Sequence, residues 1–329
     1  MIATGVGSMP GGDQPAYDEA VRVVLGELAD LPHLPEVPGR GAPAGMLGRA
    51  LAVTDGLGID LQPAGWRLTD ASGVDHRRAR SLLAQDLDGL EEQGQDYTGS
   101  FKVQVAGPWT LSATVEKPRG DKVLSDAGAR RELAQALAEG LRGHVRDVRR
   151  RLPGVDRLVV QVDEPMLAAV LGGGVPTASG FGRHRTVHPP EASEHLGWVL
   201  DAIGAEQAEP WVHSCAPGTP WALLRGAGAR GLSADLDTLS ARDHEALAEA
   251  LDAGESVALG VVASADPALA PTETELTERV LRWLDLVGLD PATVGDSLVL
   301  SPTCGLAGAT PAWSAQALRL LSAAARHLT

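Results

Sequence analysis

The sequence alternates short apolar runs with longer amphipathic segments, and it does so about eight times. The expected strands span 2–8, 33–37, 101–107, 156–164, 209–215, 231–236, 255–262 and 296–302. The clearest expected helices span 17–28, 76–93, 127–152, 191–203, 241–253, 274–287 and 312–327. In these helices the apolar residues recur at a spacing that forms one inward-facing stripe. This alternation predicts parallel strands joined by helices.

The number of strand–helix units favours an α/β fold with a closed (β/α)8 TIM barrel over an open doubly wound sheet. The open sheet would carry a Gly-x-Gly-x-x-Gly phosphate loop after its first strand, and the sequence has none there. Ser240 with Asp243 is typical of a capping box, and Thr274 with Glu275 is a weaker signal for a helix start. We find no linker or internal repeat, so we expect residues 1–329 to form a single barrel catalytic domain.

The charge of the chain restricts its partners. Its formal net charge is −15, which argues against nucleic acid as a partner because phosphate binding needs clustered Lys and Arg. No stretch reaches the roughly 20 apolar residues of a membrane span. The first residues lack the basic start and apolar core of a secretory signal, so we expect a cytoplasmic protein. Two cysteines do not make a disulfide framework, and they must be metal ligands, reactive thiols or buried residues.

Residues with chemically useful side chains recur at the carboxyl ends of the expected strands. They are Ser8, Glu36, Asp163, Glu164, His213, Cys215, Asp235 and, just beyond the last strand, Cys304. In a parallel barrel these ends converge on one mouth, where active sites lie. The sequence therefore predicts one site built from strands that are far apart in the chain.

His213 and Cys215 form a His-x-Cys pair at the end of an expected strand. Residues i and i+2 of a strand point to the same side, so both side chains can reach one ion. Zinc accepts imidazole nitrogen and thiolate sulfur, and Cys304 can supply a second thiolate. The alternative is that the cysteines are small buried hydrophobic residues. Asp235 can supply a carboxylate as fourth ligand, and the alternative at the same strand end is Asp237, which also suits a helix cap or loop.

Two further features suit an amino-acid ligand. Asp163 and Glu164 are adjacent and must point to opposite sides of their strand, so one can face the mouth and bind an ammonium group. Either acid can instead cap the short helix that follows. Gly7 and Ser8 end the first strand, and exposed backbone N–H groups with a hydroxyl suit a carboxylate.

Six motifs together resemble the cobalamin-independent methionine synthase family, in its C-terminal catalytic barrel, within the superfamily shared with uroporphyrinogen decarboxylase. They appear in the family's order and cover nearly the whole chain. The motifs are TGVGSMP (4–10), KVQVAGPWTL (102–111), VQVDEPML (160–167), WVHSCAP (211–217), LSADLD (232–237) and SPTCGLAG (301–308).

The resemblance implies a zinc-dependent methyltransferase that activates homocysteine as a thiolate and methylates it to methionine. It maps the zinc ligands onto His213, Cys215, Asp235 and Cys304. It maps the amino-acid site onto Ser8 for the carboxylate, and onto Glu36 and Asp163 for the ammonium group. We expect His213, Cys215, Cys304 and Asp163 to be the catalytic residues.

The sequence departs from the long members of the family in three ways. Its zinc acid is Asp where they have Glu, and the segment 260–269 lacks the His that they carry after the seventh strand. It also lacks their second, N-terminal barrel, so we expect a short single-barrel form.

The methyl donor, a folate or a methylcorrinoid, stays open. Three alternatives remain: a methyltransferase for another thiol, a uroporphyrinogen-decarboxylase-like lyase without metal, and a non-catalytic binding protein. The lyase should show a cationic cleft for several carboxylates, and the sequence lacks Arg clusters near its N-terminus.

Overall fold

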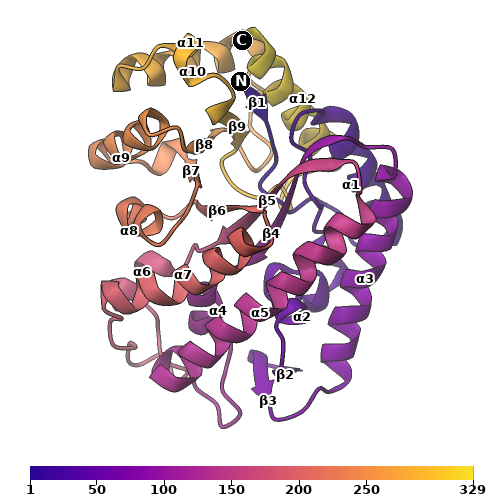
Figure 1. The fold of residues 1–329 in the computed structure, drawn as a ribbon, viewed down its shortest axis with the longest axis vertical. Helices are drawn as coiled ribbons and strands as arrows, with labels where there is room; N and C mark the ends of the chain where they lie inside the picture. The colour runs from indigo at the N-terminus through magenta and orange to yellow at the C-terminus, as the bar shows by residue number, and fades with distance from the viewer. Residues whose placement is uncertain (329) are drawn as a thin grey trace.

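The computed structural model describes residues 1–328, and in it seven of the eight predicted strands form one curled parallel sheet (Figure 1). The seven strands lie in the order β1-β9-β8-β7-β6-β5-β4. They are β1 (Ile2–Ala3), β4 (Gly99–Ala106), β5 (Val155–Asp163), β6 (Glu209–Ser214), β7 (Gly231–Asp235), β8 (Ser256–Val262) and β9 (Leu298–Pro302). Each overlaps a predicted strand, because buried apolar runs of this length fit a parallel sheet covered by helices.

The predicted strand 33–37 lies beside the sheet edges but is not a continuous strand. It makes two isolated parallel bridges, Ser8 with Glu36 and His33 with Lys102. The N–H of Leu34 donates to the carbonyl of Lys102 at 2.8 Å, and the N–H of Met9 donates to the carbonyl of Glu36 at 2.7 Å. The segment has proline at positions 32, 35 and 38. Proline has no N–H, so a regular ladder cannot form here.

The predicted helices are present, with bounds that differ by a few residues at most ends. The α-helices are α1 (Gln14–Glu27), α2 (Met46–Val53), α3 (Val74–Gly94), α4 (Pro108–Thr114), α5 (Ala127–Arg151), α6 (Leu167–Leu171), α7 (Pro189–Ala205), α8 (Trp221–Gly226), α9 (Ala241–Asp252), α10 (Glu273–Val287), α11 (Pro291–Val294) and α12 (Pro311–His327). Within residues 1–328, no helix has the length and apolar character needed to cross a membrane.

Local signals explain where several helices begin. Ser240 and Asp243 form the predicted capping box at the start of α9. The prediction for α10 was displaced, because the capping box there pairs Thr272, not Thr274, with Glu275. The sequence reading also missed the antiparallel hairpin of β2 (Gly58–Gln62) and β3 (Gly65–Thr69).

The core between the sheet and its helices consists mainly of Leu, Val and Ala, with a few large aromatic side chains such as Trp109. Trp211 belongs to a smaller, separate cluster with Leu31, Val159, Ala258 and Val299. Several polar side chains are buried with them on the inner side of the sheet, among them Lys102, Gln104 and Gln161. A buried polar group without a hydrogen-bond partner is costly, so each of these side chains needs a partner. The groups that pair with them mark the part of the fold that carries the site.

Candidate active site

A cavity of about 260 Å³ lies at the carboxyl ends of the strands. Its lining residues are Val6, Gly7, Ser8, Glu36, Pro38, Met46, Gln104, Asp163, Pro165, His213, Cys215, Cys304 and Gly305. Six of the predicted site residues are among them, and they come from five separate parts of the chain. A larger hollow of about 800 Å³ between α8 and α9 contains none of the predicted site residues. The smaller cavity is therefore the candidate active site.

His213 and Cys215 lie at the end of β6, and Cys304 follows β9. One candidate ligand atom from each of the three lies within 4.8 Å of the others. Nδ1 of His213 is 2.9 Å from the hydroxyl of Ser233 on β7, which fixes the ring. Its Nε2 is buried and has no hydrogen-bond partner in the described residues. A buried nitrogen without a partner beside two thiols is a donor set that fits a metal ion.

The two cysteines form a coupled pair. Their Sγ atoms are 2.8 Å apart. The hydrogen bond from Cys215 and the neighbouring His213 together lower the pKa of Cys304 to about 4, although burial opposes this shift. The same contact raises the pKa of Cys215. The lowered pKa favours the thiolate form of Cys304, and a thiolate is the form that binds zinc.

Asp235 ends β7 but lies outside this three-residue group. Its carboxylate accepts the backbone N–H of Asp237 at 2.9 Å. Burial raises the pKa of Asp235, and the nearby charges of Asp237 and Cys304 raise it further. Asp237 itself is in an ion pair with Arg279 on α10. The structure thus places Asp235 near the cysteines, and its role as fourth ligand stays a prediction.

Asp163 and Glu164 point to different parts of the fold. Asp163 lines the cavity and accepts a hydrogen bond from the side-chain amide of Gln161 at 2.7 Å. Burial raises its pKa to about 7. Glu164 accepts hydrogen bonds from the backbone N–H groups of Trp109 and Thr110, at 2.9 and 2.7 Å. Glu164 therefore caps α4, which precedes it in the chain, and not the short helix that follows it.

Ser8 and Glu36 reach the cavity through the bridge that joins their segments. Glu36 is 4% exposed, and its Oε1 accepts a hydrogen bond from Gln104 at 3.1 Å. Burial raises the pKa of Glu36, and the charge of Arg49 opposes the rise. Gly305 lies against Ser8, because a Cβ at this glycine would be 2.0 Å from the Ser8 hydroxyl oxygen.

The sequence reading missed a polar layer beneath the cavity. Nζ of Lys102 donates to the carbonyl of Val6 at 2.9 Å and to Oε1 of Gln161 at 2.8 Å. Burial lowers the pKa of Lys102 to about 7, while the charges of Asp163 and Glu36 oppose this shift. The signal was available, because Lys102 and Gln104, like Gln161 and Asp163, are two residues apart and share one face of a strand.

Residues 101–327 match the family model described as "Cobalamin-independent synthase, Catalytic domain". The chain resembles the solved structure of a B12-independent methionine synthase from Shewanella sp. W3-18-1 in complex with selenomethionine. The TM-score is 0.63 and the sequence identity is 15%, and the match covers 100% of this chain and 98% of that one. At this identity the likeness concerns the fold alone.

A GH5_18 protein from Streptomyces cattleya gives a TM-score of 0.47 at 14% identity, covering 99% of this chain and 80% of that one. The comparison with curated protein sequences finds no match.

Proposed function

Because this chain belongs to the cobalamin-independent methionine synthase family through its catalytic domain, we propose that it is a zinc-dependent methyltransferase that methylates homocysteine to methionine. One observation carries the proposal. A single cavity of about 260 Å³ brings together a His-Cys-Cys group and three residues suited to an amino acid, namely Ser8, Glu36 and Asp163.

We propose further that residues 1–329 form one catalytic domain with a closed (β/α)8 barrel. The segment around Leu34 supports this, because it bonds on one side to β4 and on the other to the segment that follows β1. It would occupy the eighth strand position between the two edges of the seven-stranded sheet. The cavity would then lie at the mouth of the barrel.

The metal would be held by His213, Cys215 and Cys304, with Asp235 as the proposed fourth ligand. The donor set of one imidazole and two thiolates is a common one for zinc. When bound, the ion would supply the positive charge that keeps a thiol substrate deprotonated and nucleophilic near neutral pH. Ser233 would hold the imidazole ring in the orientation that leaves Nε2 free.

The other cavity residues would bind the amino-acid part of the substrate. Asp163 and Glu36 offer carboxylates to the ammonium group, while Ser8 offers a hydroxyl to the substrate carboxylate. Holding both ends of the amino acid fixes the direction of the thiol, and this orientation lowers the entropic part of the barrier. The related structure with selenomethionine, whose amino-acid part is that of methionine, supports this use of the cavity.

The methyl donor is a folate or a methylcorrinoid in this proposal, and the cavity does not discriminate between them. Methylation of another thiol is the second candidate. The lyase alternative has less support, because no Arg or Lys among residues 1–328 lines the cavity. A substrate with many carboxylates would require such cations.

Metal content tests the proposal most directly. We expect about one zinc per chain in the purified protein, as a single site of this kind holds, and loss of the zinc in Cys215→Ser and in Cys304→Ser. Ser214→Ala is the matched control, because the Ser214 hydroxyl contacts Thr219 at 2.8 Å instead of the cavity. Methionine formation from homocysteine is then assayed with each methyl donor. If the purified protein contains no metal and both Cys variants are unchanged in stability and reactivity, the zinc proposal is wrong. If no methionine forms with any donor, the methyltransferase proposal is wrong.

A further inference from the structure

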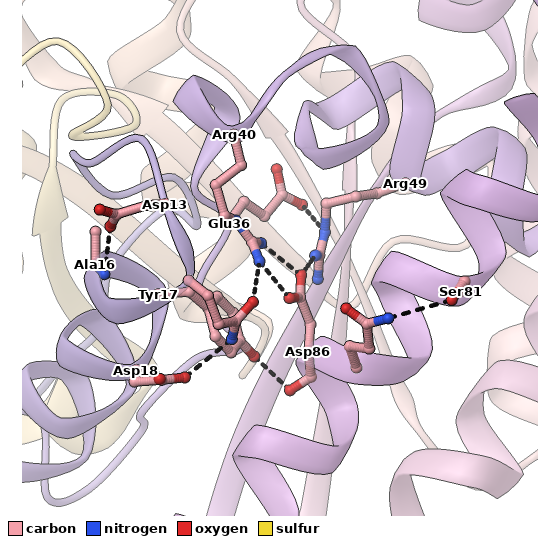
Figure 2. Close-up of polar contacts among 11 residues, drawn as sticks. Asp13, Ala16, Tyr17, Asp18, Glu36, Arg40, Arg49, Ser81 and Asp86 are labelled. Atoms are coloured by element: carbon pink, nitrogen blue, oxygen red, sulfur yellow. Dashed lines mark hydrogen bonds and ion pairs between the residues drawn. The ribbon is translucent and has the colours of Figure 1, made fainter.

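Glu36 is connected to a network of three charged side chains, Arg49, Asp86 and Arg40 (Figure 2). These three residues do not line the cavity. Its Oε1 is 3.4 Å from Nε of Arg49, which lies on α2. Arg49 also forms an ion pair with Asp86 on α3. Arg40 binds the same carboxylate through two nitrogens, at 2.7 and 2.8 Å from its two oxygens. Two guanidinium groups and two carboxylates are therefore paired between the cavity and α3.

The network leaves its members little freedom. The side chain of Asp86 is 0% exposed, and those of Arg40 and Arg49 are each 5% exposed. Arg40 also lies over the ring of Tyr17, with 4.6 Å between its guanidinium carbon and the ring centroid. Buried ion pairs contribute little net stability, because the cost of removing the charges from water offsets their attraction. A four-charge network of this kind therefore calls for a reason beyond stability.

The contacts at Glu36 indicate what the network does. Arg49 and Gln104 both contact the same oxygen, Oε1. Neither contact uses Oε2, and Glu36 lines the cavity, so we expect this oxygen to be available to a ligand there. A carboxylate that is 4% exposed loses its hydration and needs a nearby cation to stay charged. In the described residues, Arg49 is the cation within ion-pair distance of Glu36.

We propose that Arg49, held in place by Asp86, is a positioning residue that keeps Glu36 ionised and oriented toward the amino group of the substrate. This inference rests on the proposed function, because it takes an amino-acid thiol as the ligand. It assigns part of the substrate specificity to two helices, α2 and α3, whose charged residues Arg49 and Asp86 do not line the cavity. Arg40 supports the arrangement by fixing Asp86.

The test uses two thiols that differ only in the amino group: homocysteine and its desamino analogue, mercaptobutyrate. In Arg49→Gln we expect the KM and the Kd for homocysteine to rise by about tenfold or more, as for the loss of one charge-assisted contact. The kcat for homocysteine and the Kd for mercaptobutyrate should change less than about twofold. Asp86→Asn should act in the same direction, and Arg49→Lys should restore part of the loss because it keeps a point charge.

The control is Arg67→Gln, which breaks the ion pair between Arg67 and Glu116 at 2.7 Å, away from the cavity. It should change the binding of neither thiol. The Kd values come from titration calorimetry on the zinc-loaded protein, with melting temperatures measured alongside. If Arg49→Gln does not fold, Arg49→Lys and Asp86→Asn provide the same comparison.

The outcomes separate the two proposals. Equal weakening of both thiols, or no weakening of either, in Arg49→Gln would overturn the positioning role while leaving the methyltransferase proposal intact. Unaltered protein that neither binds nor methylates homocysteine would instead overturn the proposed function, and the positioning role with it.

Discussion

Gly305 offers a way to remove a hydroxyl from the cavity without touching the residue that carries it. A Cβ at this position would lie 2.0 Å from Oγ of Ser8 and 3.2 Å from its Cβ. Non-bonded heavy atoms need roughly 3.5 Å, so Gly305→Ala must displace the Ser8 hydroxyl by about 1.5 Å. Rotation about χ1 of Ser8 achieves this, since the Ser8 Cβ itself is only slightly crowded. We expect the fold to tolerate the change and the hydroxyl to leave its position.

The size of the effect follows from the role proposed for Ser8. A hydrogen bond to a charged group contributes about 1.5–3 kcal/mol, and about 1.4 kcal/mol corresponds to a factor of ten in affinity. Gly305→Ala should therefore raise the KM for homocysteine by about 10- to 150-fold, as Ser8→Ala should. In the double variant the two effects should not add, because the second change removes a group that the first has already displaced.

The assay is the initial rate of methionine formation from homocysteine, with zinc content measured for each variant. Gly305 is adjacent to the proposed ligand Cys304, so the comparison is valid only if Gly305→Ala retains its zinc. Additive losses in the double variant would refute the reasoning, since they would mean that Gly305 and Ser8 act independently. An unchanged KM in Gly305→Ala would refute it as well.

Two further predictions concern stability and pH. In α5, a Cβ at Gly140 would lie 1.9 Å from the backbone oxygen of Val53, whereas one at Gly143 would meet nothing within 4 Å. Urea unfolding should therefore show that Gly140→Ala is destabilised by about 1–3 kcal/mol and that Gly143→Ala is stabilised by about 0.5–1 kcal/mol. Changes of the same sign in the free energy of unfolding of both variants would contradict this packing. Burial lowers the pKa of Lys102 from 10.5 to about 7. Between these two pH values the unfolded chain holds a proton on Lys102 that the folded chain has lost. The contribution of Lys102 to the free energy of unfolding therefore rises with pH. Lys102→Met should lose this rise between about pH 7 and about pH 9. If the free energy of unfolding follows the same pH profile in the variant and in the unaltered protein, Lys102 does not lose its proton there.

The sequence predicted most of the sheet and its helices, because both depend on local periodicity. The failures have local causes. Three prolines prevent a regular ladder in the segment around Leu34, although the segment lies where a strand was expected. The β2–β3 hairpin was missed because its two strands, GIDLQ and GWRLT, contain polar residues and form no continuous apolar run of the kind that marks the sheet.

The candidate site was predictable where chemistry coincides with strand ends, as for His213, Cys215 and Cys304. The network behind Glu36 was not. Arg49 and Asp86 lie on different helices, and charged residues on a helix are typical of a solvated face. Only the packing of α2 against α3 buries both and brings them together. A sequence pattern carries no signal for such a pairing.

The order of charges around the cavity argues for a substrate with an amino group. The acids Asp163 and Glu36 line the cavity, while the basic side chains of Lys102 and Arg49 lie behind them and do not reach its wall. An anionic ligand would meet the carboxylates first, and the basic groups would be too deep to bind it directly. An ammonium group would instead meet two acids, and the guanidinium of Arg49 helps to keep Glu36 charged. A cavity with cations at its wall and carboxylates behind them would instead favour a ligand with several carboxylates. The observed order is therefore the one expected for an amino-acid thiol, with the ammonium at the acids and the thiol at His213, Cys215 and Cys304.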